Sequence, residues 1–161
     1  MAPGSSRPQS RSLLEPVAVG LLAQRRTSRD VAALRACVDD LEALIPAGHD
    51  PAAVAAWTRG SQRFHDLVME RAGNKTLAIQ YLVLREVVDM HLLLASSQPG
   101  LAQAPAASFM KVVRSYRKLV ALVEAGDAAR AAAHWRTHMD VAARALLPDQ
   151  LKSATVLDIF S

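Results

Sequence analysis

The chain has 161 residues, of which 51% are hydrophobic, 21% are charged and 4% are aromatic, and its formal net charge is +4. A single cysteine excludes a disulfide framework. The most apolar segment, residues 77–95, contains Arg85, Glu86 and Asp89 and therefore predicts no membrane span. The first residues lack the apolar segment of a signal peptide. We therefore expect one cytoplasmic domain in which abundant Ala and Leu favour helix over sheet.

Residues 1–10 are rich in Pro, Ser and Arg and predict a disordered tail ahead of the first helix. That helix is expected over residues 11–26, with Pro16 in its early turns, where a missing N–H is least harmful. Its apolar face is predicted to consist of Leu13, Leu14, Val17, Leu21 and Leu22.

The second and third helices carry clear start and stop signals. Thr27 and Asp30 have the spacing of a capping box at the start of the second helix. Asp50 followed by Pro51 predicts the start of the third helix. Gly73 predicts its end, because glycine adopts the left-handed conformation that closes helices. The predicted core face of the second helix contains Val31, Leu34, Cys37, Val38, Leu41 and Leu44 or Ile45, and that of the third contains Val54, Trp57, Ser61, Phe64, His65, Val68 and Ala72.

Three further helices follow. The fourth, over residues 75–95, is apolar almost all round, as expected for a helix buried on several sides or shared with a second subunit. A loop over residues 96–105 leads to a fifth helix that ends at Gly126, and a sixth runs from Asp127 to about Leu147. The predicted core residues of these last two helices are Phe109, Val112, Val113, Tyr116, Leu119, Val120, Val123, Trp135, Met139, Ala142 and Leu146.

These elements predict an all-α fold, an antiparallel bundle of six to seven helices over residues 11–147. Residues 148–161 are expected to form a tail, in which residues 154–160 could make a short helix or an extended arm. Strand alternation, a Gly-rich phosphate loop, a winged-helix pattern and an internal repeat are all absent from the sequence. A nucleotide-binding or DNA-binding domain is therefore not predicted here.

A few polar side chains stand out against the apolar pattern. Ser61 and His65 are four residues apart, so both side chains project from the same face of the third helix, which is apolar. His65 is therefore either a hydrogen-bonded core residue or part of a ligand pocket or metal site. His134 and His138 have the same spacing, which suits a metal chelate but equally a surface position. Tyr116 is the polar residue of its apolar stripe, and its hydroxyl requires a partner such as a ligand, a water or a backbone carbonyl.

Catalysis finds little support in these patterns. The His134–His138 pair lacks the adjacent acid of a His-Glu-x-x-His motif, so no general base for hydrolysis accompanies it. Neither a Ser-His-Asp nor a Cys-His arrangement is indicated, and Cys37 is expected to be a small core residue. We therefore predict that the protein is not an enzyme.

Four short blocks occur in a characteristic order. They are Arg-Ser-Leu-Leu-Glu-Pro at residues 11–16, Phe-His at 64–65 with Ala-Gly-Asn at 72–74, Gly-Asp at 126–127 and Arg-Thr-His-Met at 136–139. Together they resemble the FCD domain, the C-terminal effector-binding half of FadR-type GntR transcriptional regulators. The resemblance covers about residues 11–147 and implies the same all-α bundle, dimerisation, and an organic effector in its interior, often a carboxylate.

Many FCD domains hold a metal inside the bundle. The family ligands are an acid four residues before the Phe-His histidine, that histidine, and two later histidines; here they fall on Ser61, His65, Tyr116 and His138. Because hydroxyl groups are poor metal donors near neutral pH, the resemblance implies that a divalent metal such as zinc is absent or weakly bound through His65 and His138. The cavity is then expected to bind the effector through Ser61, His65, Tyr116 and His138, with Arg114 as a further anion partner.

The family normally places a winged helix-turn-helix before this domain, and the residues before Arg11 show no such pattern. The favoured hypothesis is therefore the ligand-sensing and dimerisation domain of a GntR-type regulator, a homodimer that reaches DNA only through a domain missing from this chain. Two alternatives remain open. One is a metal-binding helical bundle, and the other is a stand-alone dimerisation partner of full-length regulators.

Overall fold

The structure is a computed structural model that describes residues 10–48, 50–83, 85 and 104–146. All regular secondary structure within these ranges is helical, which confirms the all-α class. The long helices are α1 (Ser10–Arg25), α2 (Ser28–Ala43), α3 (Pro51–Arg71), α6 (Ala106–Glu124) and α7 (Ala128–Leu146). A further helical stretch covers residues 75–83. Residues 86–95 of the predicted fourth helix, residues 96–103 of the predicted loop, residues 1–9 and residues 147–161 lie outside the described residues.

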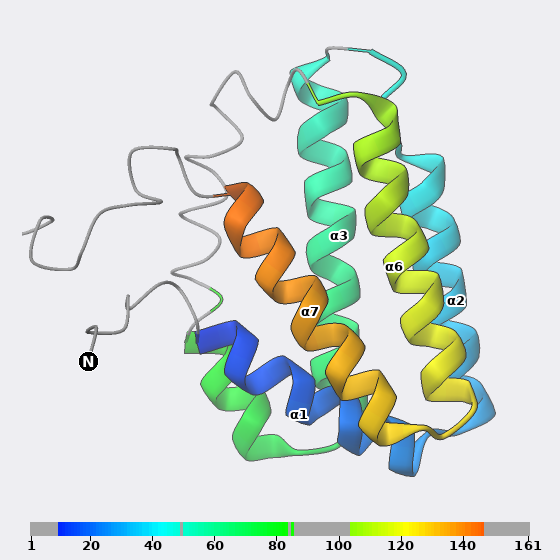
Figure 1. Cartoon of the computed structure of the whole chain (residues 1–161), viewed down its shortest axis with the longest axis vertical. Helices are drawn as coiled ribbons and strands as arrows, with labels where there is room; N and C mark the ends of the chain where they lie inside the picture. The colour runs from blue at the N-terminus through cyan, green and yellow to red at the C-terminus, as the bar shows by residue number, and fades with distance from the viewer. Residues whose placement is uncertain (1–9, 49, 84, 86–103, 147–161) are drawn as a thin grey trace, which may run out of the picture.

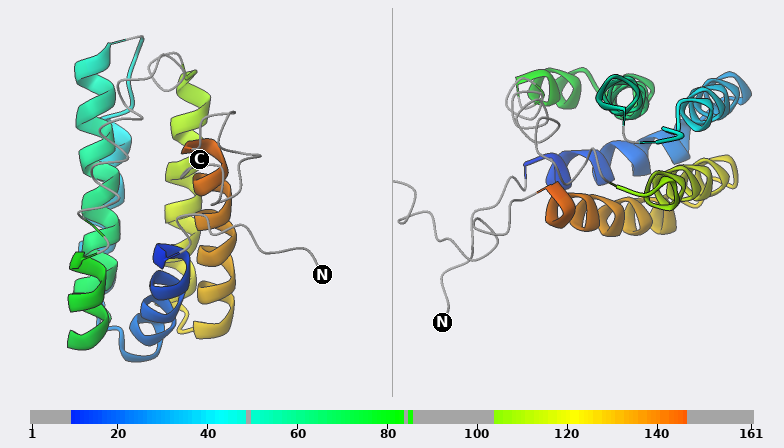
Figure 2. Two further views of the ribbon diagram at one scale, coloured as in Figure 1. Left: turned by 90° about the vertical axis from the view of Figure 1, so that its left-hand side faces the viewer. Right: turned by 90° about the horizontal axis from the view of Figure 1, so that it is seen from above.

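The helices form a bundle with α1 at its centre. In Figure 1, α3 and α6 stand nearly upright with α2 partly behind α6, while α7 crosses obliquely in front of α3. Seen from above in Figure 2, α1 runs between a layer that contains α2 and α3 and a layer that contains α6 and α7. Contacts join α1 to α3, α6 and most extensively α7. A side chain on the inner face of α1 can therefore meet residues from both layers.

Most of the predicted core faces are confirmed. The predicted stripe of α2 is buried as far as Leu41, but Leu44 is 40% exposed and Ile45 is partly exposed. The stripes of α3 and α6 are buried apart from the partly exposed Ser61 and Val112. Trp57 of α3 packs edge-on against Phe109 of α6, with ring centres 4.8 Å apart. In α7, Trp135 and Met139 are buried as expected, whereas Ala142 is partly exposed and the side chain of Leu146 lies outside the described part of the structure.

The predicted inner face of α1 is wrong in part: Leu22 is buried and Leu14 and Leu21 are partly buried, but two of its residues face outward. Leu13 and Val17 are 68% and 50% exposed, whereas the buried residues are Glu15, Pro16, Ala18, Val19, Leu22 and Ala23. Positions 15, 18, 19 and 22 have the spacing of one helix face, and the apolar Leu13 and Val17 concealed it. Pro16 also lies deeper than predicted, since α1 already begins at Ser10.

The helix ends follow the predicted signals. Thr27 and Asp30 form the capping box of α2, with the Thr27 hydroxyl accepting from the Asp30 backbone N–H. Asp50 caps α3 by accepting from the Ala52 N–H at 2.9 Å. Gly73 and Gly126 have φ values of 67° and 72°, in the left-handed region. In the described part of the chain, no helix combines the length and apolarity needed to cross a membrane.

Gly126 provides a test of this packing. A Cβ at position 126 would lie 2.7 Å from the Arg26 guanidinium, whose Nε donates to the Glu124 carbonyl at the end of α6. We predict that Gly126→Ala lowers the free energy of unfolding by about 1–2 kcal/mol, because an L-residue is strained at this φ. Urea denaturation provides the measurement. Gly48→Ala is the control, since no atom lies within 4 Å of its added Cβ, and equal effects of the two variants would contradict this account.

Candidate functional site

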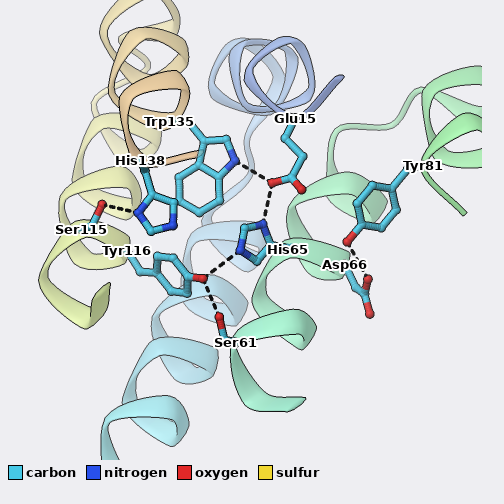
Figure 3. Close-up of polar contacts among 9 residues, drawn as sticks. All are labelled: Glu15, Ser61, His65, Asp66, Tyr81, Ser115, Tyr116, Trp135 and His138. Atoms are coloured by element: carbon cyan, nitrogen blue, oxygen red, sulfur yellow. Dashed lines mark hydrogen bonds and ion pairs between the residues drawn. The ribbon is translucent and has the colours of Figure 1, made fainter. Parts of the chain in front are cut away.

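A buried glutamate lies at the centre of the bundle. Glu15 on α1 has no exposed surface. Its Oε2 atom lies 2.6 Å from His65 Nδ1 on α3 and accepts a hydrogen bond from Trp135 Nε1 on α7 at 2.8 Å. One carboxylate oxygen therefore connects three helices (Figure 3).

The hydrogen-bonded chain continues on the far side of the His65 ring. His65 Nε2 is 2.9 Å from the Tyr116 hydroxyl of α6, and that hydroxyl is 2.8 Å from Ser61 Oγ. The sequence Glu15, His65, Tyr116, Ser61 thus crosses the core and ends at a partly exposed serine. Figure 3 shows the four side chains directed toward one another. We refer to these residues as the polar chain.

Aromatic rings enclose the polar chain. Phe64 stacks on Tyr116 with ring centres 4.2 Å apart and planes 13° from parallel. Trp135 stacks on His138 at 4.6 Å. Because Tyr116 is only 1% exposed, its hydroxyl depends on partners inside the protein.

A second group of polar contacts joins α6 to α7. His134 Nε2 donates to the Ser115 backbone oxygen at 2.9 Å, and the Ser115 hydroxyl lies 3.0 Å from His138 Nδ1. Both histidines are half-buried, so His134 is not a fully exposed surface residue. Its spacing from His138 serves interhelical hydrogen bonding here.

Three of the predicted site residues come together directly. Ser61, His65 and Tyr116 belong to the polar chain, and the His138 ring lies beside it, with centres 5.2 Å from Tyr116 and 6.2 Å from His65. Arg114 is exposed on α6, outside this cluster.

Sequence reasoning missed Glu15 and Ser115. The sequence did contain a signal for Glu15, because positions 15, 18, 19 and 22 lie on one helix face. On that face Glu15 is a charged residue next to the apolar Ala18, Val19 and Leu22. No comparable local signal marks Ser115, because its role depends on α7 lying beside α6.

The cluster offers a poor donor set for a divalent metal. Within the described residues, no three His, Cys, Asp or Glu side chains are grouped as metal ligands. At the positions where the FCD resemblance implies ligands, the chain provides two imidazoles and two hydroxyls. Both ring nitrogens of His65 are already engaged, by Glu15 and Tyr116. Coordination by His65 would have to break one of these bonds.

Cys37 behaves as predicted for a core residue. Its side chain is buried in α2. Burial is the main cause that raises the pKa of its thiol above the ordinary value. The reactive thiolate is therefore disfavoured, and a nucleophilic role has no support.

The comparisons with known proteins agree with this architecture. A family model described as the FCD domain matches residues 9–141. No curated protein and no solved structure gives a significant match. The matched range includes every residue of the polar chain.

Removal of the central carboxylate should be costly. Glu15→Ala leaves the Trp135 N–H and the His65 ring without their buried partner, so we predict a loss of about 3 kcal/mol in the free energy of unfolding. The control is Glu124→Ala, which removes an ion pair with Arg35 whose side chains are 50% and 57% exposed and should cost less than about 1 kcal/mol. Chemical denaturation of both variants measures the difference, and similar losses would show that Glu15 is not the structural centre.

Proposed function

The chain belongs to the FCD family, and on this basis we propose that the bundle senses a small organic effector and forms the dimer of a GntR-type transcriptional regulator. FCD domains are generally the ligand-binding domains of such regulators. The observation that carries the proposal is the polar chain, which connects the buried Glu15 to the partly exposed Ser61 through an otherwise apolar core.

We propose that the effector is a carboxylate bound without a metal. The partly exposed Ser61 and His138 supply a hydroxyl and an imidazole, which suit hydrogen bonding to an organic acid better than metal coordination. The buried His65 and Tyr116 hold Ser61 in place through hydrogen bonds. Arg114, being exposed, is not included in this site.

The dimer is proposed to form through the helix over residues 75–83. Its outer face carries Ile79, Leu82 and Val83, which are 64%, 54% and 68% exposed. Adjacent apolar residues of this size are typical of protein interaction surfaces. In the cytoplasm, an effector that binds one arrangement of the two subunits more tightly would shift the dimer toward it. DNA would be contacted only by a winged-helix domain outside the residues described here.

The exposed apolar face also fits a second function, a dimerisation partner of full-length regulators. Such a partner needs the helix face but has no need of a ligand at Ser61. Ligand binding therefore separates the two proposals.

Ligand binding is tested by thermal melting with a set of small mono-, di- and tricarboxylates. We predict that at least one raises the melting temperature by several degrees, since ligand at about 100 times its Kd adds about 2.7 kcal/mol of stability. Ser61→Ala should reduce this shift, whereas Thr58→Ala should retain it because the Thr58 hydroxyl donates to the Val54 carbonyl of its own helix. A set without any stabilising member, or equal shifts in both variants, would count against effector binding.

Dimerisation is tested by analytical ultracentrifugation. Leu82→Asp places a charge on the proposed interface and should weaken the dimer by at least about tenfold, equivalent to about 1.4 kcal/mol. The control is Leu44→Asp, since Leu44 is 40% exposed at the far end of α2. A monomeric wild-type protein, or a dimer that tolerates Leu82→Asp, would remove this part of the proposal.

A further inference from the structure

We propose that the outer face of α6 is a docking surface for an acidic amphipathic helix of another protein. Its cations are Lys111, Arg114 and Lys118, which we refer to as the basic face, and the apolar Val141 of α7 lies at its border. Neither effector binding nor the proposed dimer uses these residues, so the surface is separate from the proposed function.

The positive charge of the chain is concentrated in its last two described helices. Residues 106–146 contain seven Lys and Arg against three Asp and Glu, a net charge of +4 that equals that of the whole chain. Glu124 is already paired with Arg35 of α2. Asp127 is paired with Arg130 of α7. The layer that contains α6 and α7 therefore carries an excess of cations, which favours anionic partners.

Three of these cations form one stripe along α6. Lys111, Arg114 and Lys118 are spaced i, i+3 and i+7, so they project from a single helix face over about 10 Å of its length. All three are exposed, and within the described part of the chain none of them pairs with a carboxylate. The opposite side of α6 is buried in the core through Val113, Tyr116 and other residues. The basic face therefore points to solvent.

A fourth cation of α6 shows how an acidic helix can meet such residues. Arg117 donates to Asp39 of α2 at 2.9 Å and also to Glu42, which lies three residues further along the same helix. Carboxylates one turn apart on one helix thus converge on a cation of its neighbour. The basic face offers the same chemistry to a helix from outside, with three cations instead of one.

The exposed apolar residue beside the stripe favours a protein partner over a nucleic acid. Ser115 of α6 contacts both His134 and His138 of α7, which fixes how the two antiparallel helices are aligned. Val141 follows His138 by three residues, on the same side of α7. Lys111 precedes Ser115 by one turn, on the same side of α6. Val141 is 61% exposed, and the apolar face of an amphipathic helix would cover it, whereas phosphate groups would not.

The basic face and the proposed dimer surface lie on opposite sides of the bundle. In Figure 2, α6 and α7 lie on one side of α1, and the helix over residues 75–83, drawn in green, lies on the other. A partner helix and a second subunit can therefore bind at the same time. Leu82→Asp, which is expected to weaken the dimer, should leave docking on the basic face unchanged.

The test uses a fluorescein-labelled synthetic peptide of about 18 residues, long enough to form a helix, with Glu at i, i+4 and i+7 and Leu on the adjacent face. Fluorescence anisotropy measures its binding to the full chain. Combining Lys111→Gln, Arg114→Gln and Lys118→Gln should weaken binding by at least about tenfold, because three exposed ion pairs are lost. Raising NaCl from about 0.05 M to about 0.5 M should weaken binding to the wild type in the same direction. A peptide with Gln in place of Glu should bind no more tightly to the wild type than to the triple variant.

Matched variants separate docking from general charge. Combining Arg25→Gln, Arg29→Gln and Lys75→Gln removes the same charge from exposed positions outside α6 and should change binding by less than about twofold, because distant charges are screened. Val141→Ser should weaken binding at least about threefold, since part of its apolar surface is no longer covered. Val17→Ser, at a residue that is 50% exposed on α1, should have no effect.

Three results would overturn the proposal. The first is an acidic peptide that does not bind, and the second is an equal loss of binding in the two triple variants. The third is a DNA duplex of random sequence that binds the basic face more tightly than the peptide and is insensitive to Val141→Ser, which would assign the surface to nucleic acid. Circular dichroism and thermal melting establish that each variant is folded, and if the triple variant is not, Lys111→Gln and Lys118→Gln measured singly should each weaken peptide binding.

Discussion

The burial of one carboxylate determines the interior of this bundle. Glu15 has no exposed surface, and an unpaired charge in such a position would be strongly destabilising. Bonds to His65 and Trp135 offset this loss and fix α3 and α7 relative to α1. Once His65 is held on one side, its second nitrogen can only meet Tyr116. The position and orientation of the whole polar chain thus follow from a single residue on the central helix.

The same segment of α3 connects the site to the proposed dimer face. His65 points into the core, while the next residue, Asp66, accepts a hydrogen bond from Tyr81 at 2.9 Å and pairs with Arg85 at 3.3 Å. Tyr81 belongs to the helix whose outer face carries Leu82 and Val83. A ligand at Ser61 and a subunit on that face would both act on α3. This shared element is a physical means by which effector binding could bias the dimer.

The sequence predicted much of the architecture, because local signals decided it. The capping box at Thr27, the Asp50 cap and Gly126 operate within a few residues, and the structure shows all three. The stripes of α2, α3 and α6 were regular enough to identify their core faces. The hydroxyl of Tyr116 was expected to need a partner, and it has Ser61 and His65.

The remainder depends on contacts between distant segments. In α1 two apolar faces compete, and only the packing of α7 and α3 decides that Glu15 rather than Leu13 turns inward. Ser115 and His134 form their bonds because α6 and α7 are adjacent, a fact with no local signature. Arg114, which was expected as a further anion partner, is exposed on α6.

A crystal structure of the protein bound to the carboxylate that stabilises it most would test the central claim most directly. The account predicts a carboxylate oxygen within hydrogen-bonding distance of Ser61 Oγ, an intact contact between Glu15 and His65, and no anomalous signal from a metal. A metal coordinated by His65 and His138, or a ligand bound away from the polar chain, would contradict it.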